Sequence, residues 1–166
     1  LETGTWSTLA NTPGTVGYGG DVVEGPDGYL YGLRGINTSS FWRYDVGSNT
    51  WDDGAAANTP QTIYYGSSLL YDGSRYIYAL RGNNDDAFLR YDTTDNEWAS
   101  LASVDFGAVS QQVNNTVNYG GDLAYDGDNT LYSVQGNMRT GFAAYNIETD
   151  TWSQLAKTPA EVYQGG

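Results

Sequence analysis

The sequence contains neither cysteine nor histidine. Without cysteine the chain can form no disulfide, no thiolate nucleophile and no Cys-ligated zinc site. Without histidine it lacks the commonest metal ligand and the commonest general base. We therefore expect no metal site and no cofactor, and any catalysis would depend on Asp, Glu or Tyr.

Basic residues are also scarce, with 7 Lys and Arg against 20 Asp and Glu, a formal net charge of -13 and an isoelectric point near 4.1. A nucleic-acid partner is disfavoured because the chain has no cationic stripe to displace phosphate counterions. An anionic membrane surface is disfavoured for the same reason. No run of 18 or more apolar residues is present, so we predict no membrane span.

Glycine and aromatic residues are abundant instead, with 22 Gly, 15 Tyr and 5 Trp. This composition is typical of short strands joined by tight turns. Three times the chain runs from glycine to glycine in 16 residues and from that glycine to tryptophan in another 16. These landmarks are Gly19, Gly35 and Trp51; Gly66, Gly82 and Trp98; and Gly120, Gly136 and Trp152. Such a period predicts a repeat architecture.

Each repeat is predicted to hold four short antiparallel strands, the fourth lying around the tryptophan. The expected first strands are 21–24, 68–71 and 122–125, the second strands 29–34, 76–81 and 130–135, and the third strands 41–46, 88–93 and 142–147. Hairpin turns rich in Asp and Gly separate the first two strands. We predict an all-β fold of three four-stranded blades, as in a β-propeller.

The repeat also resembles the kelch family. Tyr18-Gly19-Gly20 and Tyr119-Gly120-Gly121, with the later tyrosine and tryptophan, carry the resemblance over essentially the whole chain. Tyr78-Ala79-Leu80-Arg81-Gly82 is similar to kelch-type repeats of bacterial and archaeal secreted or surface proteins, although Gly66-Ser67 departs from the glycine doublet. The resemblance implies an architecture like that of the central domain of galactose oxidase. That copper enzyme needs histidine ligands and a cysteine-tyrosine link, which this chain lacks.

The ends of the chain repeat each other, because residues 1–6 nearly match residues 147–152. We interpret residues 1–18 as the fourth strand of a preceding blade plus a linker, 19–51, 66–98 and 120–152 as blades, and 153–166 as a linker into a next repeat. Propellers usually have about 4 to 8 blades, so we expect part of a larger propeller or closure by oligomerisation. The sequence reads as a piece of a longer protein.

The candidate interaction surface is the end of the blades where second strands connect to third strands and fourth strands connect to the next blade. All variation in repeat length falls there, mostly within 103–118, which could also be a tolerated insertion without a partner. The candidate binding residues on this loop face are Asn37, Asn83, Asn84, Asp85, Asp86, Phe106, Gln111, Asn137, Met138 and Arg139. Asn37 and Asn114 begin glycosylation sequons.

Several recurring side chains are interpreted as structural. Arg34 and Arg81 recur at the end of the second strand, and we expect each to bind an acidic group or a loop carbonyl. The alternative is a ring of arginines that grips an anionic ligand, but Gln135 breaks such a ring. Most aromatics are expected in blade packing, with Tyr64, Phe106 and Tyr163 as exceptions.

The function predicted from the sequence is a non-enzymatic extracellular or cell-surface module that binds a protein or a glycan through its loop face. One alternative is a repeating structural subunit of an extracellular fibre or surface layer, held by self-association through exposed blade edges. Another is a glycan-active enzyme that uses Asp, Glu or Tyr.

Overall fold

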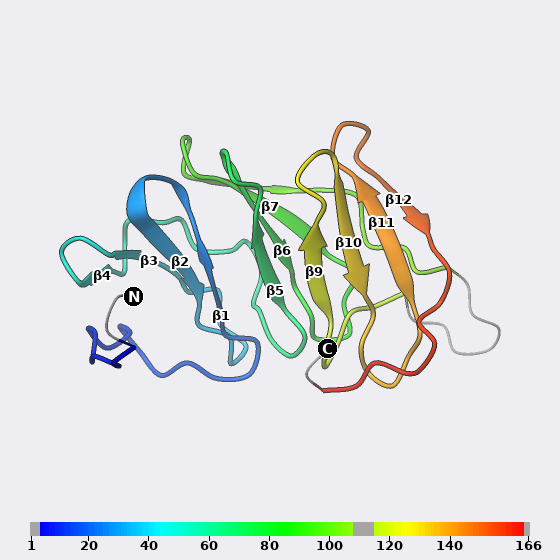
Figure 1. The fold of residues 1–166 in the computed structure, drawn as a ribbon, viewed down its shortest axis with the longest axis horizontal. Helices are drawn as coiled ribbons and strands as arrows, with labels where there is room; N and C mark the ends of the chain where they lie inside the picture. The colour runs from blue at the N-terminus through cyan, green and yellow to red at the C-terminus, as the bar shows by residue number, and fades with distance from the viewer. Residues whose placement is uncertain (1–3, 108–114, 165–166) are drawn as a thin grey trace.

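The computed structural model describes residues 4–107 and 115–164. In these ranges the chain forms twelve strands and one short 3-10 turn, Pro26–Gly28. The strands make three four-stranded antiparallel sheets that stand in a row (Figure 1). Blade 1 holds β1 (Asp21–Glu24), β2 (Tyr29–Leu33), β3 (Phe41–Asp45) and β4 (Thr50–Asp52). Blade 2 holds β5 (Ser68–Tyr71), β6 (Tyr76–Leu80), β7 (Phe88–Asp92) and β8 (Glu97–Ser100), and blade 3 holds β9 (Asp122–Tyr125), β10 (Thr130–Val134), β11 (Phe142–Asn146) and β12 (Thr151–Gln154).

The predicted all-β fold of three four-stranded antiparallel units is confirmed, and it supports propeller-like blades. The first strands match their predicted limits, whereas each second and third strand ends one residue earlier than predicted. At the ends of β2 and β6 the next residue already belongs to a loop closure, as Arg34 N–H donates to Ser40 O at 3.1 Å and Arg81 N–H to Ala87 O at 3.2 Å. The three sheets of the described ranges do not close into a ring.

The hairpins between the first two strands form for a local reason. In blade 2, Asp72 Oδ1 accepts the backbone N–H groups of Ser74, Arg75 and Tyr76 at 2.8, 2.9 and 3.0 Å. Such an Asx turn replaces backbone partners that the tight reversal removes. Gly73 follows with a φ of 77°, which only glycine adopts without steric cost.

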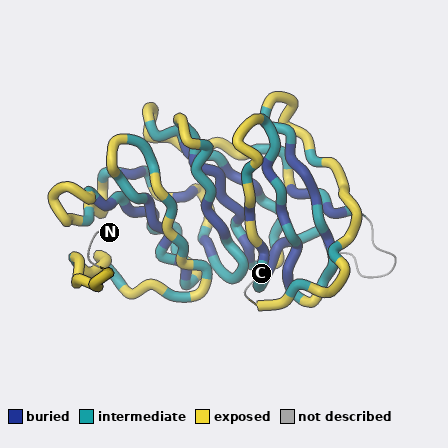
Figure 2. Tube along the Cα trace, viewed as in Figure 1, coloured by how far each residue is buried: buried dark blue, intermediate teal, exposed yellow. Residues whose placement is uncertain are grey.

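The hydrophobic core consists of two layers, one between each pair of neighbouring blades (Figure 2). Side chains alternate across each sheet, so every blade has an entry face toward the preceding blade and an exit face toward the following one. Phe41 on the exit face of blade 1 packs edge-on against Tyr91 and Trp98 of blade 2, with ring centroids 5.1 and 5.0 Å apart. The second layer repeats this contact, because Phe88 packs against Tyr145 and Trp152 at 4.9 and 5.2 Å.

The connection that precedes each blade is fastened to that blade's fourth strand. The indole Nε1–H of Trp98 donates to Ala57 O at 2.8 Å, and that of Trp152 donates to Ala102 O at 2.9 Å. Trp51 makes the same bond to Ala10 O at 3.2 Å, so residues before blade 1 follow the same path. We predicted the fourth strand of a preceding blade around Trp6. In the structure residues 4–16 form no strand, and Trp6 is fully exposed.

Candidate functional site

The loops between the second and third strands have one conformation in all three blades. The glycine two residues after each second strand is followed by two residues with positive φ, a conformation that asparagine tolerates better than most residues. These pairs are Ile36 with Asn37, Asn83 with Asn84, and Asn137 with Met138. This backbone geometry favours asparagine at these predicted binding positions, although Ile36 and Met138 also adopt it.

Hydrogen bonds fix these loops between two connections. Asn83 N–H donates to Tyr65 O at 2.8 Å, and Asn84 N–H donates to Val117 O at 3.1 Å. The loops of the other blades make the equivalent pairs of bonds, from Ile36 and Asn37 to Tyr18 and Ile63, and from Asn137 and Met138 to Tyr119 and Val162. The loop face is therefore a continuous, hydrogen-bonded rim.

A row of tyrosines runs along this rim, just before the first strand of each blade, β1, β5 and β9. Tyr18, Tyr65 and Tyr119 each precede the first glycine of a repeat. The ring centroids of Tyr18 and Tyr65 are 4.6 Å apart, and those of Tyr65 and Tyr119 are 4.2 Å apart. Tyr64 packs beside Tyr65 at 3.8 Å, and Tyr18 is 64% exposed. We call Tyr18, Tyr65 and Tyr119 the tyrosine row.

The tyrosine row lines a pocket of about 310 Å³, together with three glycines and Gln164. Gln164 occupies the same place before Gly165 that the tyrosines occupy before their glycines. Tyr18 and Tyr119 carry the resemblance of the repeat, but the row was not predicted as a site. Their signal was present, because an aromatic residue precedes the first glycine in all three repeats.

Tyr64 and Tyr65 form a hydrogen-bonded pair of phenol groups, and the pKa of each is raised. Tyr64 Oη donates to Tyr65 Oη at 2.9 Å, and this bond raises the pKa of Tyr64. The same bond lowers the pKa of Tyr65, but its hydrogen bond to Tyr119 and desolvation outweigh that effect, so the pKa of Tyr65 is raised. The pocket therefore offers aromatic faces and hydroxyl groups.

The other predicted binding residues fall in several different environments. Asp85 forms an ion pair with Arg81 and accepts the N–H of Ala87 at 2.8 Å. Asp86 contributes its carbonyl oxygen to Val104 N–H at 2.9 Å. Arg139 pairs with Val162 through a backbone bridge, and Met138 is 58% exposed.

Phe106 was predicted to be a binding residue, but it is a core residue. Its side chain is 7% exposed and packs in the layer between blades 2 and 3 with Val104 and Val117. Asn37 is exposed, and its Oδ1 accepts a hydrogen bond from Thr62 Oγ1 at 2.8 Å. Gln111 and the sequon residue Asn114 lie outside the described residues.

The structural role predicted for the recurring arginines is confirmed. Arg34 Nε–H donates to Thr15 O at 3.1 Å, and Arg81 Nε–H donates to Thr62 O at 3.0 Å. In the third repeat Gln135 Nε2–H makes the equivalent bond to Thr116 O at 3.3 Å. These side chains fasten each blade to the connection that precedes it.

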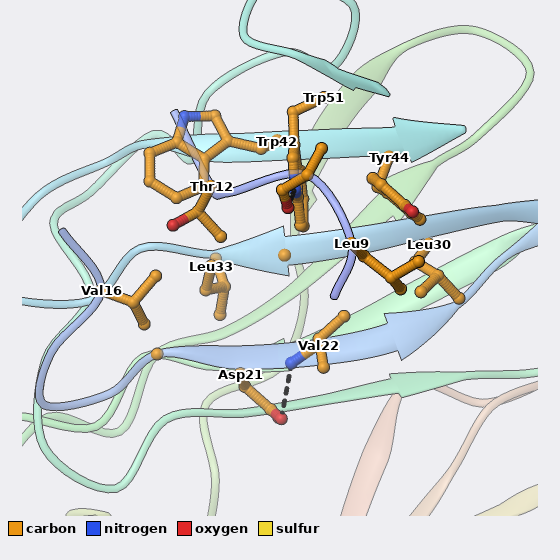
Figure 3. Close-up of a pocket in the computed structure, with 13 residues that line it drawn as sticks. Leu9, Thr12, Val16, Asp21, Val22, Leu30, Leu33, Trp42, Tyr44 and Trp51 are labelled. Atoms are coloured by element: carbon orange, nitrogen blue, oxygen red, sulfur yellow. Dashed lines mark hydrogen bonds between the residues drawn. The ribbon is translucent and has the colours of Figure 1, made fainter. Parts of the chain in front are cut away.

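A second pocket, of about 450 Å³, lies on the entry face of blade 1 (Figure 3). Val22, Leu30, Trp42, Tyr44 and Trp51 line it, with Leu9 and Val16 from the preceding connection. Asp21 stands at its edge, where its carboxylate accepts the N–H groups of Val22 at 2.8 Å and Leu69 at 2.7 Å. Burial raises the pKa of Asp21 in spite of these bonds.

Within residues 4–107 and 115–164, no group of three or more Asp or Glu residues is arranged to hold a metal ion. The part of the chain that the structure describes also contains no helix long and apolar enough to cross a membrane.

Comparison with known proteins supports the fold. No family model matches the sequence, and no curated protein matches it. Among solved structures, the structure of YjhT is similar, with a TM-score of 0.67 and 14% sequence identity. The match covers 95% of this chain and 57% of YjhT, so the chain spans little more than half of that protein. At this identity the likeness extends to the fold alone.

Proposed function

We propose that this chain is part of a kelch-like propeller, located outside the cell or on its surface, that binds a glycan without catalysis. The observation that supports the proposal is the tyrosine row on the loop face. Aromatic faces flanked by hydroxyl groups suit sugar rings, which present apolar C–H faces and polar edges. The volume of about 310 Å³ lies at the lower end of the range for small-molecule pockets.

The chemistry of the site favours an uncharged sugar. Hydrogen bonding and desolvation raise the pKa values of Tyr64 and Tyr65, so these two groups add no negative charge, and the net charge of -13 repels anionic glycans over long range. The rim that carries the row is fixed by hydrogen bonds from the loops of all three blades. A rigid site loses little conformational freedom on binding, which favours affinity. The exposed sequon at Asn37 on the same face suits a secreted protein.

The test is a glycan-array screen, followed by calorimetry with the neutral oligosaccharide that binds best. Tyr65→Ala removes the central ring of the row, and we expect affinity to fall about tenfold, which corresponds to about 1.4 kcal/mol. Tyr71→Ala is the matched control, because Tyr71 lies at the opposite end of its blade and its hydroxyl donates to Ser74 O at 2.9 Å. Equal losses in both variants, or no glycan binding at all, would overturn the proposal.

A further inference from the structure

The contact between neighbouring blades has two preformed halves. The exit half is a stacked tyrosine and phenylalanine, and the entry half is a tilted tyrosine and tryptophan. The exit pairs are Tyr31 with Phe41 at 5.6 Å and 24°, and Tyr78 with Phe88 at 5.8 Å and 19°. The entry pairs are Tyr91 with Trp98 at 5.2 Å and 43°, and Tyr145 with Trp152 at 5.2 Å and 46°.

Both halves recur at the two ends of the array, where the described part of the chain provides no neighbouring blade. On the exit face of blade 3, Tyr132 and Phe142 stack at 5.9 Å and 23°. On the entry face of blade 1, Tyr44 and Trp51 lie at 5.0 Å and 45°. These distances and angles match those of the aromatic pairs between blades 1, 2 and 3. The two end faces therefore have the geometry of the faces that pack together inside the array.

Exposure of the neighbouring residues supports this interpretation. Val22 on the entry face of blade 1 is 57% exposed, whereas its equivalents Leu69 and Leu123 are 7% and 8% exposed. The pocket of about 450 Å³ lies beside Val22, in the layer that the preceding blade fills at the other two positions (Figure 3). Ala124 is exposed on the exit face of blade 3, whereas its equivalent Leu70 packs against the core.

We propose that the exit face of blade 3 docks on the entry face of blade 1 of a second copy, and that two copies close a ring of six blades. The occupant is inferred from continuity, because the two joints inside the chain already pair these same faces. The number of copies follows from closure. Propellers have about 4 to 8 blades, so for copies of these 166 residues, with three blades each, two copies and six blades fall within this range.

The repeated ends of the chain explain how the seam is completed. Trp6-Ser7, Leu9-Ala10 and Thr12-Pro13 recur as Trp152-Ser153, Leu155-Ala156 and Thr158-Pro159. Ala10 O accepts the indole N–H of Trp51, and Ala156 is the equivalent residue at the other end. Only one connection fits at each seam, so residues 152–162 of the second copy replace residues 6–16. The bond of Trp51 then passes from Ala10 to the second copy's Ala156, while the aromatic contact is gained.

The experiment measures the mass of the 166-residue chain by sedimentation equilibrium and light scattering. We expect 36 kDa, twice the 18.0 kDa of one chain. Val22→Lys damages the entry face and Ala124→Lys damages the exit face, and each is expected to give a folded monomer. Both residues are exposed, so neither change disturbs the interior. Thr94→Lys is the matched control with the same change of charge at an exposed residue of the turn between β7 and β8, in the middle blade and outside both end faces, and it is expected to remain a dimer.

Mixing provides a test that does not depend on the stability of either variant. A Val22→Lys copy keeps an intact exit face and an Ala124→Lys copy keeps an intact entry face, so an equimolar mixture can form one sound seam. We expect a mixed dimer at concentrations where each variant alone is monomeric. A monomeric unmodified chain would overturn the proposal and leave a blade of a longer chain as the occupant of the entry face. Growth beyond the dimer would overturn the closed ring.

Discussion

The contact of Phe88 with blade 3 leads to the most quantitative prediction. Phe88 is 1% exposed, and its ring packs edge-on against Tyr145 and Trp152 at interplanar angles of 75° and 69°. Phe88→Ala should lower the free energy of unfolding by about 3–5 kcal/mol, the usual cost of truncating a buried phenylalanine. Two edge-to-face pairs at about 0.5–1.5 kcal/mol each account for about 1–3 kcal/mol of this loss.

A double-mutant cycle separates the ring contact from simple burial. Phe88→Leu and Trp152→Leu, made singly and together, should show a coupling energy of about 0.5–1.5 kcal/mol. The control cycle pairs Phe88 with Trp51, which packs against Trp42 and Tyr44 and shares no aromatic partner with Phe88. There the effects should add to within about 0.3–0.5 kcal/mol.

The assay for both cycles is urea unfolding followed by far-UV circular dichroism and tryptophan fluorescence. A Val22→Lys background keeps association between copies out of the measured free energy. The two probes should give the same midpoint if the blades unfold together. Equal coupling in the two cycles would refute the idea that the aromatic joint holds neighbouring blades together.

Three further predictions concern single positions. Arg75 lowers the pKa of Asp92 from 3.8 to about 2. The stability that comes from the ionised carboxylate is therefore present above pH 4 and is lost as the pH falls toward 2. In Asp92→Asn, the urea midpoint of unfolding should fall less over this pH range. Gly82→Ala should destabilise more than Gly73→Ala in thermal unfolding, because both glycines have positive φ but only at Gly82 would a Cβ meet backbone, at Tyr65. Arg81→Gln should unfold with a free energy about 1 kcal/mol higher than Arg81→Met, because glutamine can keep the bond to the loop carbonyl.

Each of these predictions has a contrasting outcome. Asp53→Asn changes an exposed aspartate. If it altered the decrease of stability at low pH as much as Asp92→Asn did, the net charge and not the contact with Arg75 would cause that decrease. Equal melting temperatures for the two glycine variants would mean that the close approach at Gly82 is relieved by movement. Equal stabilities of the glutamine and methionine variants would show that the bond at position 81 contributes nothing.

Local sequence patterns predicted much of the fold. The spacing of Gly66, Gly82 and Trp98 marked a four-stranded unit, and the Asp-Gly turn at residues 72 and 73 marked its first hairpin. These features depend on residues close together in the chain, so a single sequence can report them. Limits failed only at the ends of the second and third strands, where the neighbouring connections decide which residue still pairs.

The candidate site was only partly predictable. The loop face and its asparagines were identified from the places where the repeats vary. Phe106 was assigned to that face because it lies in the longest connection, but the structure buries it between blades 2 and 3. Hydrophobicity marks a buried residue and a binding residue in the same way, so only its surroundings could distinguish the two.

The sequence by itself determined that this protein is a threefold repeat of short strands with matching ends, because periodicity and turn chemistry are local properties. Tertiary structure decided what the repeats do together. It placed Tyr18, Tyr65 and Tyr119 side by side, although they are 47 and 54 residues apart, because β1, β5 and β9 pack as neighbours. It also showed that, within the described residues, the entry face of blade 1 and the exit face of blade 3 pack against no other blade, a fact that depends on how the sheets pack and not on local sequence.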